Sequence, residues 1–202
     1  MVGIAVYFAL DSALVFLRPG FSVLHNAESD YGSKGRYAWV MDANFLLRGV
    51  LSFAVVRALG LSDANRARLR TGLTLLLVWA VASGLLAFFP DDPVGTKTHG
   101  LARVHLLLAG IAFLGVLLGT IILSRALRAD PLWHPLGVPL TVLSRGAVLP
   151  VLVLGWVHLR PHSLGGLYEK LFLGMELAWF LLVAWRISRL QTALGGSRSM
   201  IR

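Results

Sequence analysis

Six apolar stretches, each near the length of a membrane span, occupy most of this sequence. They cover residues 1–17, 37–58, 71–89, 100–124, 137–158 and 166–187. A helix needs about 20 apolar residues to cross the ~30 Å hydrocarbon core of a bilayer, because each residue adds about 1.5 Å. The first stretch is marginal in length, and it lacks the basic start and small-residue cleavage pattern of a signal peptide. The sequence therefore predicts an all-α integral membrane bundle of six transmembrane helices.

Charged residues are too scarce to give this chain a water-facing surface. They make up 14% of the 202 residues, whereas soluble domains carry about 25%. The net charge of +9 does not indicate nucleic-acid binding, because the basic residues lie mostly at the ends of the apolar stretches. The absence of cysteine excludes disulfides and thiolate metal sites. We therefore expect membrane lipid as the main partner of the chain.

The distribution of arginine predicts an orientation. The segments 57–70, 125–128 and 186–202 are rich in arginine, whereas the alternate loops mix basic with acidic residues. By the positive-inside rule, both termini are predicted to be cytoplasmic. We expect the protein to lie in the inner (plasma) membrane. Because no internal repeat is evident, residues 1–194 are predicted to form a single six-helix domain. Residues 195–202 are expected to be a short basic cytoplasmic tail.

In this orientation, a layer of polar residues lies on the outer side. It contains His25, His99, His105, His158 and His162. Its densest part, residues 89–105, supplies His105 and Asp92 as a candidate catalytic base and its orienting partner. His99, His105 and Asp92 are also candidate zinc ligands, although their spacing is not a zinc signature. The alternative is that Asp92 and Thr98 only cap the next helix.

A second group of ionisable residues lies within the apolar stretches. Arg48, Arg145 and Glu176 fall near mid-depth, and Asp42 falls in the outer half of its helix. A charge at the bilayer centre costs about 2.5–3.5 kcal/mol. We therefore expect these side chains to face inward and to pair, Glu176 with one arginine and Asp42 with the other. Such a network either fixes the helix packing or forms the floor of an outward-facing polar cavity.

The cavity hypothesis assigns a role to each of these residues. An anionic or polar head group, such as a lipid phosphate, would suit the two arginines. Asp42 and Glu176 are candidate proton donors. Tryptophan is a candidate for the walls, although it is also common at membrane interfaces. The candidate substrate-binding residues are Arg48, Arg145, Ser29, Asp30, Trp39 and Trp179.

Four short motifs resemble those of a known family. They are PGFSVLHNAESDYG in the first outer loop, YAWVMDANFLLRGV in the second helix, FPDDP followed by His105, and GGLYEKLFLGMELAWFLLVAWRI in the last helix. Their order and spacing are similar to those of the bacterial and archaeal membrane family known as domain of unknown function 998. The resemblance spans nearly the whole chain and implies six helices and membrane residence, but no chemistry. It points to Ser29, Asp30, Asp92, His105 and Glu169.

Three functions stay open. The first is a membrane-embedded enzyme acting on a lipid or isoprenoid. It would be a hydrolase using His105 and Asp92, with zinc as a candidate cofactor, or a cyclase in which Asp42 or Glu176 donates a proton. The residue inventory is loosely similar to that of the alkaline ceramidase superfamily, but its paired histidines are missing from residues 166–189. The alternative is a non-catalytic lipid-binding, sensory or scaffold protein. A small transporter is disfavoured, because the six spans show no repeat.

Overall fold

All regular structure in the described part of the chain is helical. The computed structural model describes residues 2–62, 66–92, 98–157 and 163–199. The helices are α1 (Val2–Leu17), α2 (Ala38–Ser62), α3 (Arg66–Leu85), α4 (Gly100–Arg128), α5 (Gly137–Gly146), α6 (Val148–Val157) and α7 (Gly165–Ser199). The short 3-10 turns are η1 (Ser29–Gly32), η2 (Leu86–Phe88) and η3 (His134–Leu136). The prediction of an all-α fold is confirmed.

Within the residues that the structure describes, five helical stretches are long and apolar enough to cross a membrane. They are Ala38–Leu61, Ala67–Phe88, Gly100–Arg128, His134–Val157 and Gly165–Thr192. The apolar helix α1 has 16 residues, which gives it a length of about 24 Å, short of the ~30 Å hydrocarbon core. The chain is therefore a multi-pass helical membrane protein. The side of the membrane on which its termini lie stays a prediction.

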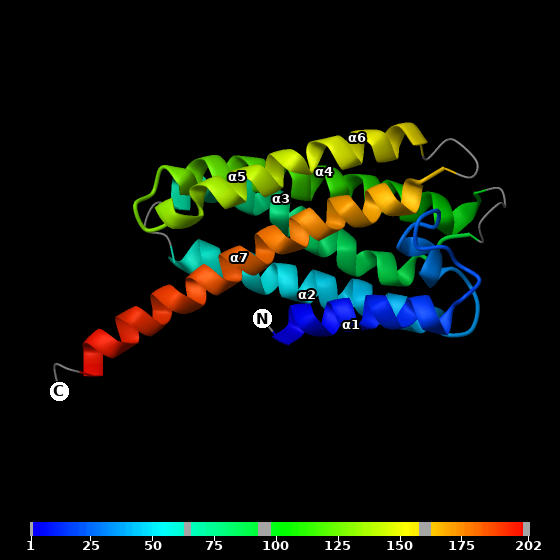
Figure 1. Cartoon of the computed structure of the whole chain (residues 1–202), viewed down its shortest axis with the longest axis horizontal. Coiled ribbons are helices and arrows are strands. Elements are labelled where there is room, and N and C mark those ends of the chain that lie inside the picture. The colour runs from blue at the N-terminus through cyan, green and yellow to red at the C-terminus, as the bar shows by residue number, and fades with distance from the viewer. Residues whose placement is uncertain (1, 63–65, 93–97, 158–162, 200–202) are drawn as a thin grey trace.

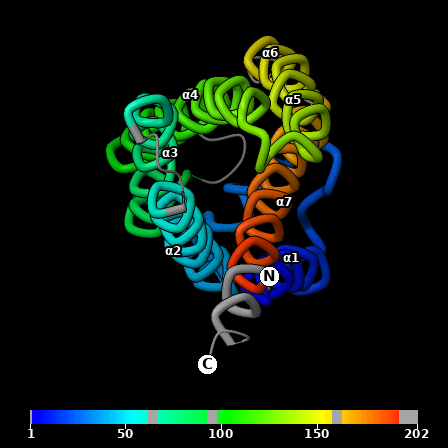
Figure 2. The backbone as a smooth tube through the Cα atoms, turned by 90° about the vertical axis from the view of Figure 1, so that its left-hand side faces the viewer, coloured from blue at the N-terminus to red at the C-terminus, as the bar shows by residue number. Residues whose placement is uncertain are grey.

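The helices run back and forth along one long axis (Figure 1). The segment 18–37, which joins α1 to α2, lies at the right-hand end of Figure 1, near the start of α7. We call this end of the bundle the first-loop end. Seen along the axis, α2, α3 and α4 stand side by side, and α7 lies between α1 and the pair α5 and α6 (Figure 2).

The fifth predicted helix is interrupted in its middle. Helix α5 ends at Gly146 and α6 begins at Val148. Pro150 has no N–H to donate to the carbonyl group of Gly146, four residues earlier, so the regular hydrogen-bond ladder cannot continue there. The interruption divides this span into two short helices.

Two buried tryptophans tie neighbouring helices together. Trp79 of α3 donates its Nε1–H to Ser52 Oγ of α2 across 2.9 Å. Trp179 of α7 donates to Ser124 Oγ of α4 across 2.8 Å. A buried indole N–H needs such a partner. These bonds fix how the helices are packed around the candidate site.

Candidate functional site

The segment between α1 and α2 folds back onto the start of α7. The amide of Leu167 donates to the carbonyl oxygen of Leu24 across 2.9 Å, and Lys170 Nζ donates to the carbonyl oxygen of Asn26 across 2.9 Å. A Cβ atom on Gly166 would lie only 2.1 Å from that Asn26 oxygen, so a side chain at this position is excluded. These contacts hold the loop against α7 and place its polar side chains inside the bundle.

Hydrogen bonds within the loop fix the turn η1. Asp30 Oδ2 accepts from the amide of Ala27 across 2.8 Å and from Asn26 Nδ2 across 2.9 Å. Arg18, just after α1, donates through Nη1 to the carbonyl oxygen of Tyr31 across 2.5 Å. Burial raises the pKa of the Asp30 carboxyl above its ordinary value, and the hydrogen bonds from Asn26 and Ala27 act in the opposite direction. The position of Asp30 is thus set by local bonds.

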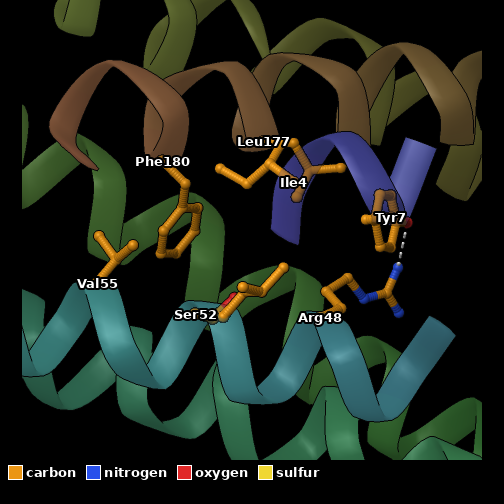
Figure 3. Close-up of a pocket in the computed structure, with 8 residues that line it drawn as sticks. Ile4, Tyr7, Arg48, Ser52, Val55, Leu177 and Phe180 are labelled. Carbon is orange, nitrogen blue, oxygen red and sulfur yellow. Dashed lines mark hydrogen bonds between the residues drawn. The ribbon is translucent and has the colours of Figure 1, made fainter. Parts of the chain in front are cut away.

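Glu28 of the loop pairs with Arg48 of α2 inside the bundle. Arg48 Nη1 lies 2.7 Å from Glu28 Oε2, and the two side chains are only 2% and 4% exposed. Tyr7 of α1 donates its hydroxyl to Glu28 Oε1. It also accepts from Arg48 Nη1 at 3.4 Å (Figure 3). The guanidinium carbon of Arg48 lies 5.0 Å from the ring centres of both Phe45 and Trp79. The charge of Arg48 is therefore already balanced within the protein.

A small cavity lies beside this ion pair, between α1, α2 and α7 (Figure 3). Its volume is about 20 Å³, and its lining includes Ile4, Leu51 and Phe180. This volume has room for about one water molecule. The small cavity therefore cannot hold an organic ligand.

A much larger cavity of about 430 Å³ lies between the first loop, α4 and α6. Ligand pockets in proteins have volumes of about 300–1,000 Å³. Its polar lining comes from segments at the first-loop end and consists of Ser29, Asp30, Arg48, Asp91, His105 and Glu169. Its apolar walls include Leu106, Ala109, Phe113 and Leu114 of α4, and Val151 and Leu154 of α6. We call this space the amphipathic cavity, because one end is polar and the rest is apolar.

His105 lines the amphipathic cavity and has a buried ring nitrogen without a partner among the described residues. Its Nδ1 lies 2.6 Å from the carbonyl oxygen of Phe89. Because a carbonyl oxygen only accepts, Nδ1 carries the proton of the neutral ring and Nε2 is left as an acceptor. Nε2 has no hydrogen-bond partner in the described part of the chain, and the side chain is 2% exposed. An unsatisfied buried polar atom costs roughly 1–3 kcal/mol, so a ligand that supplies a donor would stabilise this site.

The structure brings four of the predicted catalytic and substrate-binding residues together around the amphipathic cavity, along with Glu169, to which the family resemblance pointed. The four are Ser29, Asp30, Arg48 and His105. Asp92 has a different position, because its Oδ2 accepts the backbone amide of His99 across 2.8 Å at the start of α4. Asp92 thus holds the residue just before the first turn of α4, rather than accepting one of the first amides of that helix as a cap does. The neighbouring Asp91 lines the cavity instead.

The predicted pairing of the interior charges is wrong. Glu176 is buried near Thr120, whose hydroxyl donates to Glu176 Oε1 across 3.4 Å. Arg48 is paired with Glu28, which the folded-back loop brings into the bundle. Arg145 is exposed on α5, so it neither faces inward nor lines the amphipathic cavity. Asp42 is half-buried and forms no salt bridge with an arginine among the described residues.

The two predicted tryptophans do not line the amphipathic cavity. Trp179 is buried in the core, where it binds Ser124. Trp39 is 67% exposed at the start of α2, a position typical of membrane-interface tryptophans. The aromatic side chains in the cavity wall are Phe45 and Phe113.

The geometry gives no support to the predicted zinc site. Within the described ranges, no three His, Cys, Asp or Glu side chains lie close enough together to hold a metal ion. His99 is exposed at the start of α4, Asp92 binds the His99 amide, and His105 Nδ1 faces the Phe89 carbonyl. His158 and His162 lie outside the described residues.

Sequence reasoning missed Tyr7, Glu28 and Asp91 as site residues. Glu28 was visible in the loop motif PGFSVLHNAESDYG, but its charge alone did not indicate that the loop enters the bundle. The available signal was Arg48, because a buried arginine requires an acidic partner. Every carboxylate in the adjoining loops was a candidate for that partner.

A family model covers most of the chain. The model, described as Protein of unknown function (DUF998), matches residues 1–186. Comparison with the curated proteins and with the solved structures finds no match.

Proposed function

The chain belongs to the DUF998 family of proteins of unknown function, and on that premise we propose that it binds a membrane amphiphile in the amphipathic cavity. The polar head would lie among the polar residues at the first-loop end, and the hydrocarbon chain would lie between α4 and α6. The observation that carries this proposal is the division of one cavity into a polar end and apolar walls. A lipid or isoprenoid has the same division.

The dimensions of the cavity fit such a ligand. Its α4 lining runs from His105 to Leu114, a rise of about 13 Å along a helix. A head group and the first part of a chain fit in this length, and the rest of the chain would extend into the surrounding bilayer.

The exposed part of the lining indicates how the ligand would enter. Leu114 is 60% exposed, and Gly110 and Gly155 are also exposed. In a membrane these residues would face lipid, because they belong to the spanning stretches. We therefore propose lateral entry from the bilayer, between α4 and α6.

Two glycines allow a direct test by filling the cavity. A Cβ atom on Gly110 or Gly155 would meet no atom within 4 Å, so leucine at either position would occupy cavity space without a clash at its first carbon. Gly174 on α7 is equally open but does not line the cavity. The matched variants are Gly110→Leu, Gly155→Leu and, as the control, Gly174→Leu.

The experiment uses purified protein in phosphatidylcholine nanodiscs and hexadecanol that carries a photoreactive diazirine on its chain. We expect saturable labelling of the natural protein, strongly reduced labelling of the two cavity variants, and unchanged labelling of the control. Equal labelling of all four proteins would contradict the proposal and favour a scaffold role.

A catalytic form of this function is favoured by one observation: Nε2 of His105, a residue that lines the cavity, has no partner among the described residues. In this form His105 would accept a proton from a bound hydroxyl or amine, and the Phe89 carbonyl would hold the ring in the required tautomer. Mass spectrometry of lipid extracts incubated with the natural protein and with His105→Asn would test it. A product that both proteins form equally would exclude His105 as the base.

A further inference from the structure

The charged residues of the amphipathic cavity indicate which head group it accepts, provided that the proposed function holds. Three carboxyl side chains line it, those of Asp30, Asp91 and Glu169. Arg48 also lines it, but its guanidinium is bound to Glu28. The nearby Lys170 donates to the Asn26 carbonyl and does not line the cavity. The lining therefore carries an excess of acidic groups.

The carboxyl groups act on one another across the polar end. The negative charge of Asp91 contributes to raising the pKa of Asp30, after the larger effect of burial. Like charges that are held together in a partly buried space are stabilised by a cation between them. A bound cation would relieve this repulsion.

The imidazole of His105, which also lines the cavity, has the same preference. Nε2 of His105 is buried, lacks a partner in the described ranges, and is an acceptor in the neutral ring. It therefore needs a ligand that donates a hydrogen bond. An ammonium group supplies both a positive charge and several N–H donors, whereas a phosphate supplies only negative charge and acceptors.

From this combination we infer that the cavity selects an amphiphile with a cationic amine head group. The two arginines expected to hold an anionic head group do not serve this purpose, since Arg48 is paired and Arg145 lies outside the cavity. Asp30, Asp91 and Glu169 would bind the ammonium, and His105 would accept one of its hydrogens.

The test compares three competitors that differ only in their head groups. Hexadecylamine, hexadecanol and hexadecyl phosphate would compete with the photoreactive hexadecanol in phosphatidylcholine nanodiscs, with each concentration expressed per mole of membrane lipid. We expect hexadecylamine to compete about tenfold better than hexadecanol, a ratio that corresponds to ~1.4 kcal/mol. Hexadecyl phosphate is expected to compete less well than hexadecanol.

Variants then identify the groups responsible. Asp91→Asn and Glu169→Gln should each bring the amine-to-alcohol ratio closer to one, while photolabelling itself persists. Asp130→Asn is the control, because Asp130 follows α4 at the opposite end of the bundle, where its Oδ1 accepts the Leu132 amide. If either cavity variant fails to fold, the other and Asp30→Asn give the same comparison.

The outcomes separate this inference from the proposed function. A phosphate that competes as well as the amine, or a ratio unchanged in every carboxyl variant, would overturn the inference of a cationic head group. The proposed function would survive that result if Gly155→Leu still blocked labelling. Labelling that resists both the competitors and Gly155→Leu would overturn both.

Discussion

His105 Nδ1 and the carbonyl oxygen of Phe89 lie 2.6 Å apart, which joins the second turn of α4 to the chain segment that follows η2. This bond holds one nitrogen of a ring that lines the amphipathic cavity and leaves the other nitrogen without a partner among the described residues. The two nitrogens can thus have separate roles, Nδ1 in holding the fold and Nε2 in accepting a hydrogen bond from the proposed ligand.

Substitution of His105 should separate these two roles. In His105→Asn, the side-chain amide can still donate to the Phe89 carbonyl, so we expect near-natural stability but weaker competition by hexadecylamine. His105→Leu loses both nitrogens and leaves that carbonyl without its donor, which should destabilise the protein by roughly 1–3 kcal/mol. Thermal unfolding in detergent and the competition assay would measure the two effects. Equal loss of stability in both variants would contradict the assignment.

The ion pair between Glu28 and Arg48 should be essential for the position of the first loop. Arg48→Met leaves the Glu28 carboxylate buried without its partner, and we expect a loss of roughly 3–5 kcal/mol in the free energy of unfolding. The double variant Glu28→Gln/Arg48→Met should lose less, because no unpaired charge remains. Unfolding in mixed detergent micelles would measure this, with Arg145→Met as the exposed control. If the double variant lost as much free energy of unfolding as Arg48→Met and Glu28→Gln together, the result would argue against direct pairing.

Asp30 should make the stability of the protein depend on pH. Burial raises the pKa of the Asp30 carboxyl in the folded state. Its contribution to stability is therefore complete below the pKa of the unfolded chain, about 3.9. That contribution is lost as the pH rises through the pKa of the folded state. Asp30→Asn keeps an acceptor for Ala27 and removes this titration. As the pH rises above about 4, the unfolding temperature of the natural protein should therefore fall more than that of Asp30→Asn. Parallel curves would contradict this.

The orientation in the membrane can be tested with single cysteines, because the natural chain has none. Lys34→Cys lies in the exposed part of the first loop, and Ala129→Cys lies at the opposite end, after α4. By the positive-inside prediction, a membrane-impermeant maleimide should label Lys34→Cys in intact cells. It should label Ala129→Cys only after the membrane is permeabilised. The reverse pattern would invert the predicted topology.

The helices were predictable because hydropathy and length are local properties. The predicted stretch 100–124 lies within α4, and 166–187 lies within α7. The inward position of Arg48 and Glu176 also followed from the cost of exposing a charge to lipid.

The partners of these buried groups were not predictable from spacing. Glu28 lies 20 residues before Arg48 and reaches it only because the loop turns back against Gly166. The same rule predicted that Arg145 faces inward, but its side chain is exposed. The direction of that side chain depends on how α5 packs and not on its depth in the membrane. The roles of Asp91 and Asp92 also depend on the rotation of the backbone after η2, which the sequence does not reveal.

The position of a bound chain is the most direct test of the amphipathic cavity. Hexadecylamine with a diazirine near the end of its chain can be photolysed in nanodiscs, and the modified residues can be located by mass spectrometry of peptides. We predict that modification concentrates on residues 106–114 of α4 and 151–155 of α6, and that it decreases in Gly155→Leu. Modification spread evenly over exposed residues elsewhere, such as Phe53 and Val81, and unaffected by Gly155→Leu would contradict the proposed binding site.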